Sequence, residues 1–353
     1  MKALVITKQG YGNMELKEVQ KPEPIDNLIR VKVAYAGICG TDIHCYKGEY
    51  DRFNPPLILG HEFSGIVDAV GENVTKVKPG DRVTSETTLW TCGECENCKN
   101  REYNLCRNRK GIGSQVDGCF AEYIIVREES VHKLADNISL LAASITEPIA
   151  CGVHASMEKS NVQAGDMVVI LGPGPIGLCL AQVLKSMDVK VIVAGITKDE
   201  KRLELAKNLG VDLTVDTMKE NLPKIVSEYT NGKGADIVFE CSGVALVLGN
   251  IFDLLKQKGQ LIQMGVFAKN ENLLDLNAIV QREICVIGSR SQKPSSWITT
   301  LHLMKEGKIT PEKLITRIEP LDNWEEAFQA AMQGTEIKVV LQPNMLDVKE
   351  GGI

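Results

Sequence analysis

Glycines at positions 172, 174 and 177 stand between an apolar strand-like run, 167–171, and an apolar helix-like segment, 178–187. Glycine at these places lets the turn close tightly, lets the backbone approach a ligand, and lets the helix pack on the strand. Because the free N–H groups of a helix start point at such a turn, the turn can bind phosphate. A tight structural turn without a ligand is the alternative. The candidate residues for a dinucleotide pyrophosphate are Gly172, Gly174, Pro175, Ile176 and Gly177.

The pattern of apolar and turn-forming residues changes near residue 150. Before it, short strand-like stretches are broken by Gly, Pro, Asn and Asp, which indicates a mostly β, barrel-like domain. Beyond it, strand-like runs such as KVIVAG and ADIVFECSG alternate with helix-like segments such as DEKRLELAKNLG and LVLGNIFDLLKQKG. That alternation is typical of a parallel sheet covered on both faces.

Past about residue 290 the alternation fades. Helical segments near 295–306 and 323–334 lead to the strand-like KVVLQP, which could return to the first domain. A chain of 353 residues is also longer than most single cores can usefully grow. We therefore expect a mostly β domain over 1–150, completed by 291–353, and a dinucleotide-binding domain over 151–290.

Charge and hydropathy exclude several classes of protein. The formal net charge is -6, and no basic cluster suited to nucleic-acid phosphates is present. The start, MKALVITKQG, lacks the layout of a secretory signal, and no apolar run approaches the roughly 20 residues needed to cross a bilayer. We expect a cytoplasmic protein that binds neither nucleic acid nor membrane.

Four of the 11 cysteines follow one another as C-x2-C-x2-C-x7-C in TCGECENCKNREYNLC. In a long chain without a secretory signal, cysteines are better interpreted as thiols or metal ligands than as disulfides. Four thiolates on one short lobe can enclose a zinc ion and leave no open position, which indicates a structural site. An iron–sulfur cluster is the alternative. The predicted ligands are Cys92, Cys95, Cys98 and Cys106.

A second group of possible metal ligands lies earlier in the chain. Cys39 occurs in AGICGTDIH, and His61 and Glu62 occur in LGHEFSGIVDAVGENV. A thiolate, an imidazole and a carboxylate form the mixed donor set expected where zinc keeps one position open for water or substrate. By composition alone, a buried Cys or His is more often a packing residue.

Gly60-His61-Glu62 with Gly65, Gly71 and Val74 forms G-H-E-x2-G-x5-G-x2-V. This pattern resembles the signature of the zinc-containing medium-chain alcohol dehydrogenases. With CGTDIH, the four-cysteine lobe and the glycine turn, the resemblance covers essentially the whole chain. It implies an α/β fold class: a Rossmann doubly wound parallel sheet plus a GroES-like, mostly β catalytic domain.

The resemblance also implies roles for individual residues. Cys39 and His61 would be ligands of a catalytic zinc, with Glu147 of ITEPIACGVHA as the third protein contact. Glu62 would bind the zinc or act beside it by tuning the local charge. The Thr41 hydroxyl would contact the substrate oxygen, and His44 would pass the proton towards solvent. His44 as an ordinary surface residue is the alternative.

Cofactor selection depends on the segment after Gly195. An acid that grips the ribose 2'-hydroxyl of NAD is absent from the end of KVIVAG, while Lys198 and Arg202 could neutralise a 2'-phosphate. Asp199 could serve NAD if the loop folds back, so we expect NAD(P) with a lean to NADP. The residues expected to flank the cofactor further along the chain are Gly243, Gly265 and Val266, with Arg290 near substrate and cofactor by resemblance.

These features predict an oxidoreductase with two zinc ions per chain, one catalytic and one structural. The expected substrate is a small secondary alcohol, either a polyol such as sorbitol or a vicinal diol, and L-threonine is the second candidate. A non-catalytic zinc and dinucleotide binder is the alternative from a different class, and a zinc-free reductase of the same broad family is a third possibility. The resemblance implies a homodimer or homotetramer, formed through edge strands around 270–290.

Overall fold

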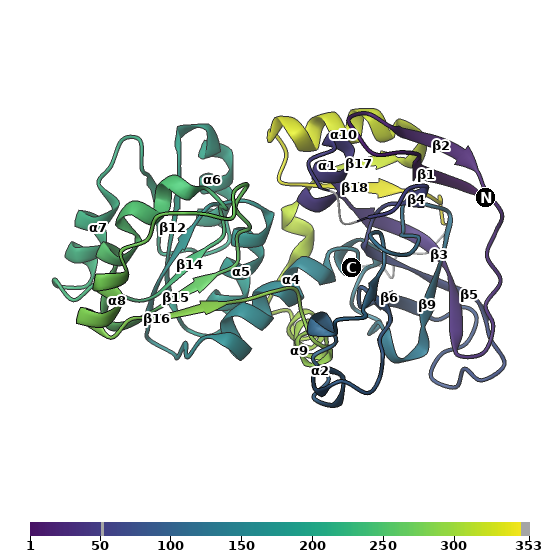
Figure 1. The fold of residues 1–353 in the computed structure, drawn as a ribbon, viewed down its shortest axis with the longest axis horizontal. Coiled ribbons are helices and arrows are strands. Elements are labelled where there is room, and N and C mark those ends of the chain that lie inside the picture. Colours follow the sequence, from purple (N-terminus) through teal and green to yellow (C-terminus); the bar gives the residue numbers. More distant parts are fainter. Residues whose placement is uncertain (51–52, 347–353) are drawn as a thin grey trace. The chain divides into compact units, whose positions relative to one another are not determined.

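The computed structural model describes residues 1–50 and 53–346. The chain divides into two compact units (Figure 1). One consists of Met1–Glu147 with the described residues from Lys293 onwards, and the other of Pro148–Gln292. Each unit has its own sheet and its own apolar core.

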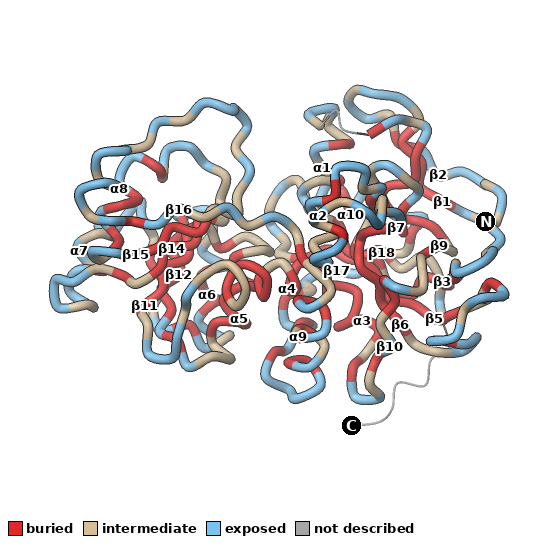
Figure 2. The backbone as a smooth tube through the Cα atoms, turned by 60° about the horizontal axis from the view of Figure 1, so that its bottom comes forward, coloured by how far each residue is buried: buried red, intermediate tan, exposed pale blue. Residues whose placement is uncertain are grey.

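The second unit contains a six-stranded parallel sheet in the order β13-β12-β11-β14-β15-β16. This order is typical of dinucleotide-binding sheets and confirms the expected α/β fold. All five residues of β11 are buried, as a central strand covered on both faces requires. Figure 2 shows buried residues concentrated along these strands. The strands are β11 (Met167–Leu171), β12 (Lys190–Gly195), β13 (Leu213–Asp216), β14 (Ala235–Glu240), β15 (Leu255–Gln263) and β16 (Cys285–Gly288).

Helices connect these strands. Their bounds are α5 (Pro175–Lys185), α6 (Glu200–Asn208), α7 (Leu222–Tyr229) and α8 (Leu276–Arg282), with a 3-10 turn η4 (Thr197–Asp199); a π-helical segment, η3 (His154–Lys159), precedes β11. No helix in the described part of the chain is both long and apolar enough to cross a bilayer.

The expectation of a helix over LVLGNIFDLLKQKG was wrong. Residues Ala245–Leu254 form 3-10 turns, η5, interrupted at Asn250, and the chain from Leu255 onwards is already strand β15. Gly249 directly precedes the interruption, and glycine has low helix propensity. Pairing of Leu255 with Ala235 of β14 then competes successfully with helix formation.

The first unit is mostly β. Its seven-stranded sheet has the order β10-β6-β5-β3-β18-β17, with β9 also paired to β3, and a three-stranded sheet has the order β2-β1-β4. The strands are β1 (Lys2–Ile6), β2 (Met14–Glu18), β3 (Leu28–Gly37), β4 (Leu57–Ile58), β5 (Glu62–Val70), β6 (Arg82–Ser85), β7 (Thr88–Trp90), β8 (Lys110–Gly111), β9 (Tyr123–Arg127), β10 (Val131–Lys133), β17 (Ile315–Pro320) and β18 (Lys338–Gln342).

Helices of 4 to 12 residues lie along the chain among these strands. They are α1 (Gly40–Lys47), α2 (Glu96–Lys99), α3 (Leu140–Ala143), α4 (Thr146–Val153), α9 (Pro294–Lys305) and α10 (Trp324–Gln333), with 3-10 turns η1 (Tyr103–Leu105), η2 (Glu128–Ser130), η6 (Pro311–Leu314) and η7 (Leu321–Asn323). Helix α4 begins at the boundary between the two units.

The C-terminal segment returns to the first unit. Strand β18, which contains the KVVLQ residues, pairs antiparallel with β3. Phe328 of α10 packs edge-on against Phe120 at a centroid distance of 6.0 Å, and both side chains are buried. The core of this unit is therefore built from both ends of the chain.

A buried ion pair joins β18 to β5. The Lys338 ammonium lies 2.6 Å from the Glu62 carboxylate and donates to the Ile38 carbonyl at 2.9 Å. The two side chains are only 4% and 1% exposed. A charge buried this deeply is tolerated only while its partner is present.

Replacing Lys338 with Met should therefore destabilise the protein by about 3 kcal/mol, because Glu62 would remain buried without a cation. Urea unfolding of the metal-free protein measures this loss. The Lys338→Met/Glu62→Gln double variant should recover much of it. Lys2→Met, which breaks the exposed pair with Asp322, is the matched control and should unfold like the wild type. A Lys338→Met protein as stable as this control would contradict the prediction.

Candidate metal centres and cofactor loop

The four cysteines of the lobe converge. Their sulfur atoms all lie within 4.8 Å of one another, with Cys92 3.8 Å from Cys98 and 3.6 Å from Cys106. Sulfur atoms bound tetrahedrally to one zinc at about 2.3 Å stand about 3.8 Å apart, so the group fits the ion. Backbone N–H groups of Cys95 and Glu94 lower the pKa of the Cys92 thiol to about 6, which favours the thiolate that a metal requires.

Cys39, His61 and Glu62 form the second group, again with one ligand atom each inside a 4.8 Å limit. Cys39 caps the start of α1, and His61 and Glu62 lie where the chain enters β5. These two places are separated in the sequence. They lie side by side in the structure because β5 pairs with β3, which ends just before Cys39. The mixed sulfur, nitrogen and oxygen donors suit an open zinc site.

Asp42 holds the two ligand loops together. Its carboxylate accepts the Cys39 N–H at 2.9 Å and the Gly60 N–H at 3.2 Å, and lies 3.7 Å from His61 Nδ1. Burial opposes a charged imidazole, but the negative charges of Asp42 and Cys39 outweigh it and raise the pKa of His61 well above its usual value. The same negative potential favours a metal cation.

Sequence reasoning missed Asp42 and Lys338. Asp42 carried a local signal, since it stands three residues after Cys39 in the same CGTDIH motif. Lys338 carried none, because 276 residues separate it from Glu62.

Thr41, Glu147 and His44, also predicted for this site, differ in their burial and contacts. The Thr41 hydroxyl lies 3.8 Å from the Cys39 sulfur, and Glu147 is buried and contributes to the raised pKa of His61. Glu147 is not part of the compact ligand group. The His44 side chain is exposed, with Nδ1 2.7 Å from a Glu49 carboxylate oxygen.

The glycine turn follows β11 as predicted and leads into α5. Gly172 has a φ of +102°, a conformation that suits glycine, and Gly174 caps α5 with Pro175 at its first turn. A Cβ on Gly177 would stand 2.1 Å from the Gly172 carbonyl oxygen. The backbone can close this tightly only with glycine, which leaves the helix N-terminus accessible to an anion.

Two further loops meet this turn at the carboxyl edge of the sheet. A Cβ on Gly172 would lie 3.0 Å from Ser242, and one on Gly243 would lie 2.6 Å from the Val266 carbonyl oxygen. Val266, in the loop after β15, is 90% exposed. Parallel sheets bind ligands at this edge.

The segment after β12 bears on cofactor choice. The Asp199 carboxylate accepts the Ile196 N–H at 3.2 Å and lies 3.4 Å from Arg202. Lys198 is exposed on η4. Arg290, exposed two residues beyond β16, lies outside these contacts.

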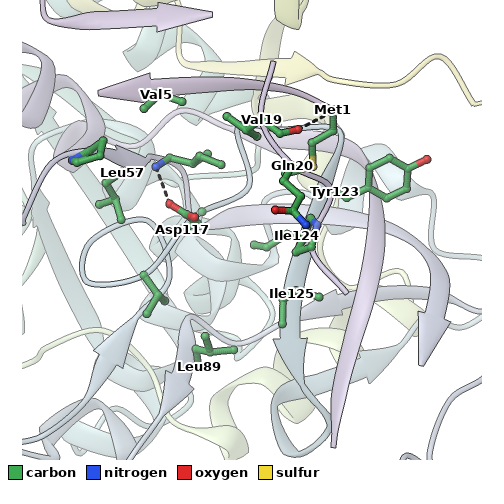
Figure 3. Close-up of a pocket in the computed structure, with 15 residues that line it drawn as sticks. Met1, Val5, Val19, Gln20, Leu57, Leu89, Asp117, Tyr123, Ile124 and Ile125 are labelled. Atoms are coloured by element: carbon green, nitrogen blue, oxygen red, sulfur yellow. Dashed lines mark hydrogen bonds between the residues drawn. The ribbon is translucent and has the colours of Figure 1, made fainter. Parts of the chain in front are cut away.

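A cavity of about 520 Å³ lies elsewhere in the first unit (Figure 3). Apolar side chains such as Val5, Leu57 and Ile124 line it, and Asp117 accepts the Ile58 N–H there at 3.0 Å. No residue of either metal-ligand group lines this cavity, so we do not assign the chemistry to it.

Comparison with known proteins agrees with this geometry. Residues 26–136 match the model of the alcohol dehydrogenase GroES-like domain, and residues 175–306 match that of the zinc-binding dehydrogenases. D-arabitol-phosphate dehydrogenase of Enterococcus avium is 50% identical over 344 residues, 98% of each chain. Sorbitol dehydrogenase of Halalkalibacterium halodurans is 46% identical over 343 residues, 97% of this chain and 99% of the relative.

The solved structure of 2R,3R-butanediol dehydrogenase from Bacillus subtilis superimposes with a TM-score of 0.88 at 30% identity, over 97% of this chain and 99% of that one. The resemblance inferred from the motifs is thus confirmed along nearly the full length. The chain belongs to the zinc-containing medium-chain alcohol dehydrogenase family and is an oxidoreductase that uses zinc and a nicotinamide cofactor.

Proposed function

We propose that this enzyme oxidises a secondary hydroxyl group of a polyol, free or phosphorylated, with NAD(P)+. The convergence of Cys39, His61 and Glu62 on one point carries the proposal, since that donor set leaves a position for a substrate oxygen. The names of two full-length relatives, a sorbitol and a D-arabitol-phosphate dehydrogenase, support the polyol class. L-Threonine, suggested by motif resemblance, is the second candidate.

In this proposal Cys39 and His61 hold a catalytic zinc with Glu147 as a further ligand, and Glu62, which lies in the same compact group, either binds the zinc or tunes its charge. When bound, zinc would supply the Lewis acidity that lets a hydroxyl lose its proton near neutral pH, and the nicotinamide would supply the hydride acceptor. Asp42 orients the loops of Cys39 and His61. Lys338 compensates the charge of Glu62 and so restrains its carboxylate.

Thr41 and His44 form the proposed proton path. Both lie on α1 and are three residues apart, so they share a face of that helix. The Thr41 hydroxyl, beside the Cys39 sulfur, would accept the proton of the substrate hydroxyl while donating its own proton towards His44, which would release a proton to solvent. The exposure of His44 and its contact with Glu49 suit the solvent end of such a path.

In the second unit, the turn from Gly172 to Gly177 binds the pyrophosphate, and the loops containing Gly243, Gly265 and Val266 flank the cofactor. Strand β12 ends at Gly195 without an acid at its last residue, and Asp199, in the following turn, already accepts from the Ile196 N–H and from Arg202. Lys198 and Arg202 are the proposed 2'-phosphate contacts, which favours NADP.

A kinetic panel tests the proposed function. Sorbitol, D-arabitol, D-arabitol phosphates, 2,3-butanediol and L-threonine would each be assayed with NAD+ and NADP+. The highest kcat/KM is expected for a polyol or its phosphate with NADP+, because the site offers an open metal position and a basic loop. Preference for L-threonine would overturn the polyol assignment, and preference for NAD+ would overturn the role of Lys198 and Arg202.

The two metal groups predict two zinc ions per chain. Cys39→Ser should remove about one zinc and nearly all activity while changing the melting temperature little, because only the open site is lost. Cys92→Ser should instead remove the enclosed zinc and lower the melting temperature, since structural zinc contributes to folding. Elemental analysis of the purified proteins, with thermal melts, distinguishes the two. A wild type holding a single zinc, or a Cys39→Ser variant holding two, would contradict this assignment.

We also propose self-association through the 270–290 segment, as a homodimer or homotetramer. Strand β16 is an edge strand with open hydrogen-bonding groups, and Leu273, Leu276 and Val280 near it are 92%, 67% and 78% exposed. Sedimentation velocity at micromolar concentration should show an oligomer, and Val280→Lys should shift it towards monomer. A wild type that sediments as a monomer would refute the interface.

A further inference from the structure

Glu240, the last residue of β14, is a fully buried acid surrounded by hydrogen-bond donors. One carboxylate oxygen accepts the backbone N–H groups of Ser242 at 2.8 Å and Gly243 at 3.0 Å, and also the Ser242 hydroxyl. The other accepts the Gln263 amide at 2.6 Å and the Gly243 N–H at 3.2 Å. Backbone N–H and amide NH2 groups can only donate, so this arrangement matches an ionised carboxylate.

Among the described residues, no lysine, arginine or histidine forms an ion pair with Glu240. Glu62, the buried acid of the metal group, is by contrast paired with Lys338. The Glu240 carboxylate is therefore a negative charge stabilised by hydrogen-bond donors, without a counter-ion among the described residues. Its electric field acts on a ligand bound beside these loops.

The charge lies directly behind the loops proposed to hold the cofactor. A Cβ on Gly265 would stand 2.3 Å from the Glu240 carboxylate and 2.5 Å from the Gly243 nitrogen. The N–H groups of Met264 and Gly265 both donate to the Glu240 carbonyl at 2.9 Å. Gln263 bridges the same carboxylate to the Gly265 carbonyl, at 2.8 Å. Glu240 thus joins the loop after β14 to the loop after β15.

We infer that Glu240 is a positioning residue that also sets the preference of this site between the two redox forms of the nicotinamide. The oxidised ring carries a positive charge and the reduced ring is neutral, so an uncompensated carboxylate behind the loop stabilises the oxidised form selectively. In the oxidation direction this promotes binding of the oxidised cofactor and release of the reduced one. The inference rests on the proposed cofactor site and adds a residue that the motifs did not indicate.

The inference is tested by measuring the dissociation constants of the oxidised and the reduced cofactor. The dinucleotide used, NAD or NADP, is the one that the wild type binds more tightly. The reduced form is followed by its fluorescence and the oxidised form by competition against it. In Glu240→Gln the ratio of the oxidised to the reduced dissociation constant should rise roughly tenfold. Equal weakening of both forms would show that Glu240 only shapes the loops, and would overturn the inference.

Ser242→Ala is the matched control, because it removes one hydrogen bond to the same carboxylate and leaves the charge. It should change both constants by the same factor. Gln263→Lys places a cation beside the intact carboxylate and should raise the ratio as Glu240→Gln does, which provides the test if Glu240→Gln fails to fold. If the ratio of the two dissociation constants is unchanged in a folded Gln263→Lys protein, the inference about Glu240 is overturned and the proposed function is not. A wild type that binds neither dinucleotide would overturn the proposed function as well.

Discussion

The bridge that Asp42 makes between two loops is the contact on which the candidate metal site depends. Its carboxylate binds the N–H groups of Cys39 and Gly60, so the sulfur and the imidazole that follow these groups are held at one point. The same negative charge favours a cation between them. The pairing of β3 with β5 brings the two segments together, and the Asp42 contact then fixes the backbone of Cys39 against that of Gly60.

The two units stabilise their buried carboxylates in different ways. In the first unit, the acid next to the metal group is neutralised by a lysine from the last strand of the sheet, so that the local charge around the ligands is limited. In the second unit, Glu240 accepts hydrogen bonds from backbone N–H groups, the Gln263 amide and the Ser242 hydroxyl, and its negative charge lies at the carboxyl edge of the sheet. The difference suits the proposed ligands, because one site receives a metal cation and the other a ring whose charge changes during the reaction.

Much of the architecture could be predicted because its signals are local. The apolar run 167–171, the glycine turn and the following helix occupy consecutive residues, and the alternation beyond them indicated a parallel sheet that the structure confirms. The helix expected over LVLGNIFDLLKQKG failed for the opposite reason. Its apolar residues are compatible with helix or strand, and pairing with β14, a tertiary interaction, decided that Leu255 begins a strand.

By itself, the sequence determined the fold class and the family, and it indicated the cysteine lobe and the Cys39, His61 and Glu62 residues that the structure brings together, because each motif carries its chemistry within a few neighbouring residues. The tertiary structure decided which residues support those motifs. Asp42, Lys338 and Glu240 have their roles through partners on other strands or loops and through burial. Neither a contact across 276 residues nor the hydrogen bonds around a buried acid leave a periodic or spaced pattern in the chain.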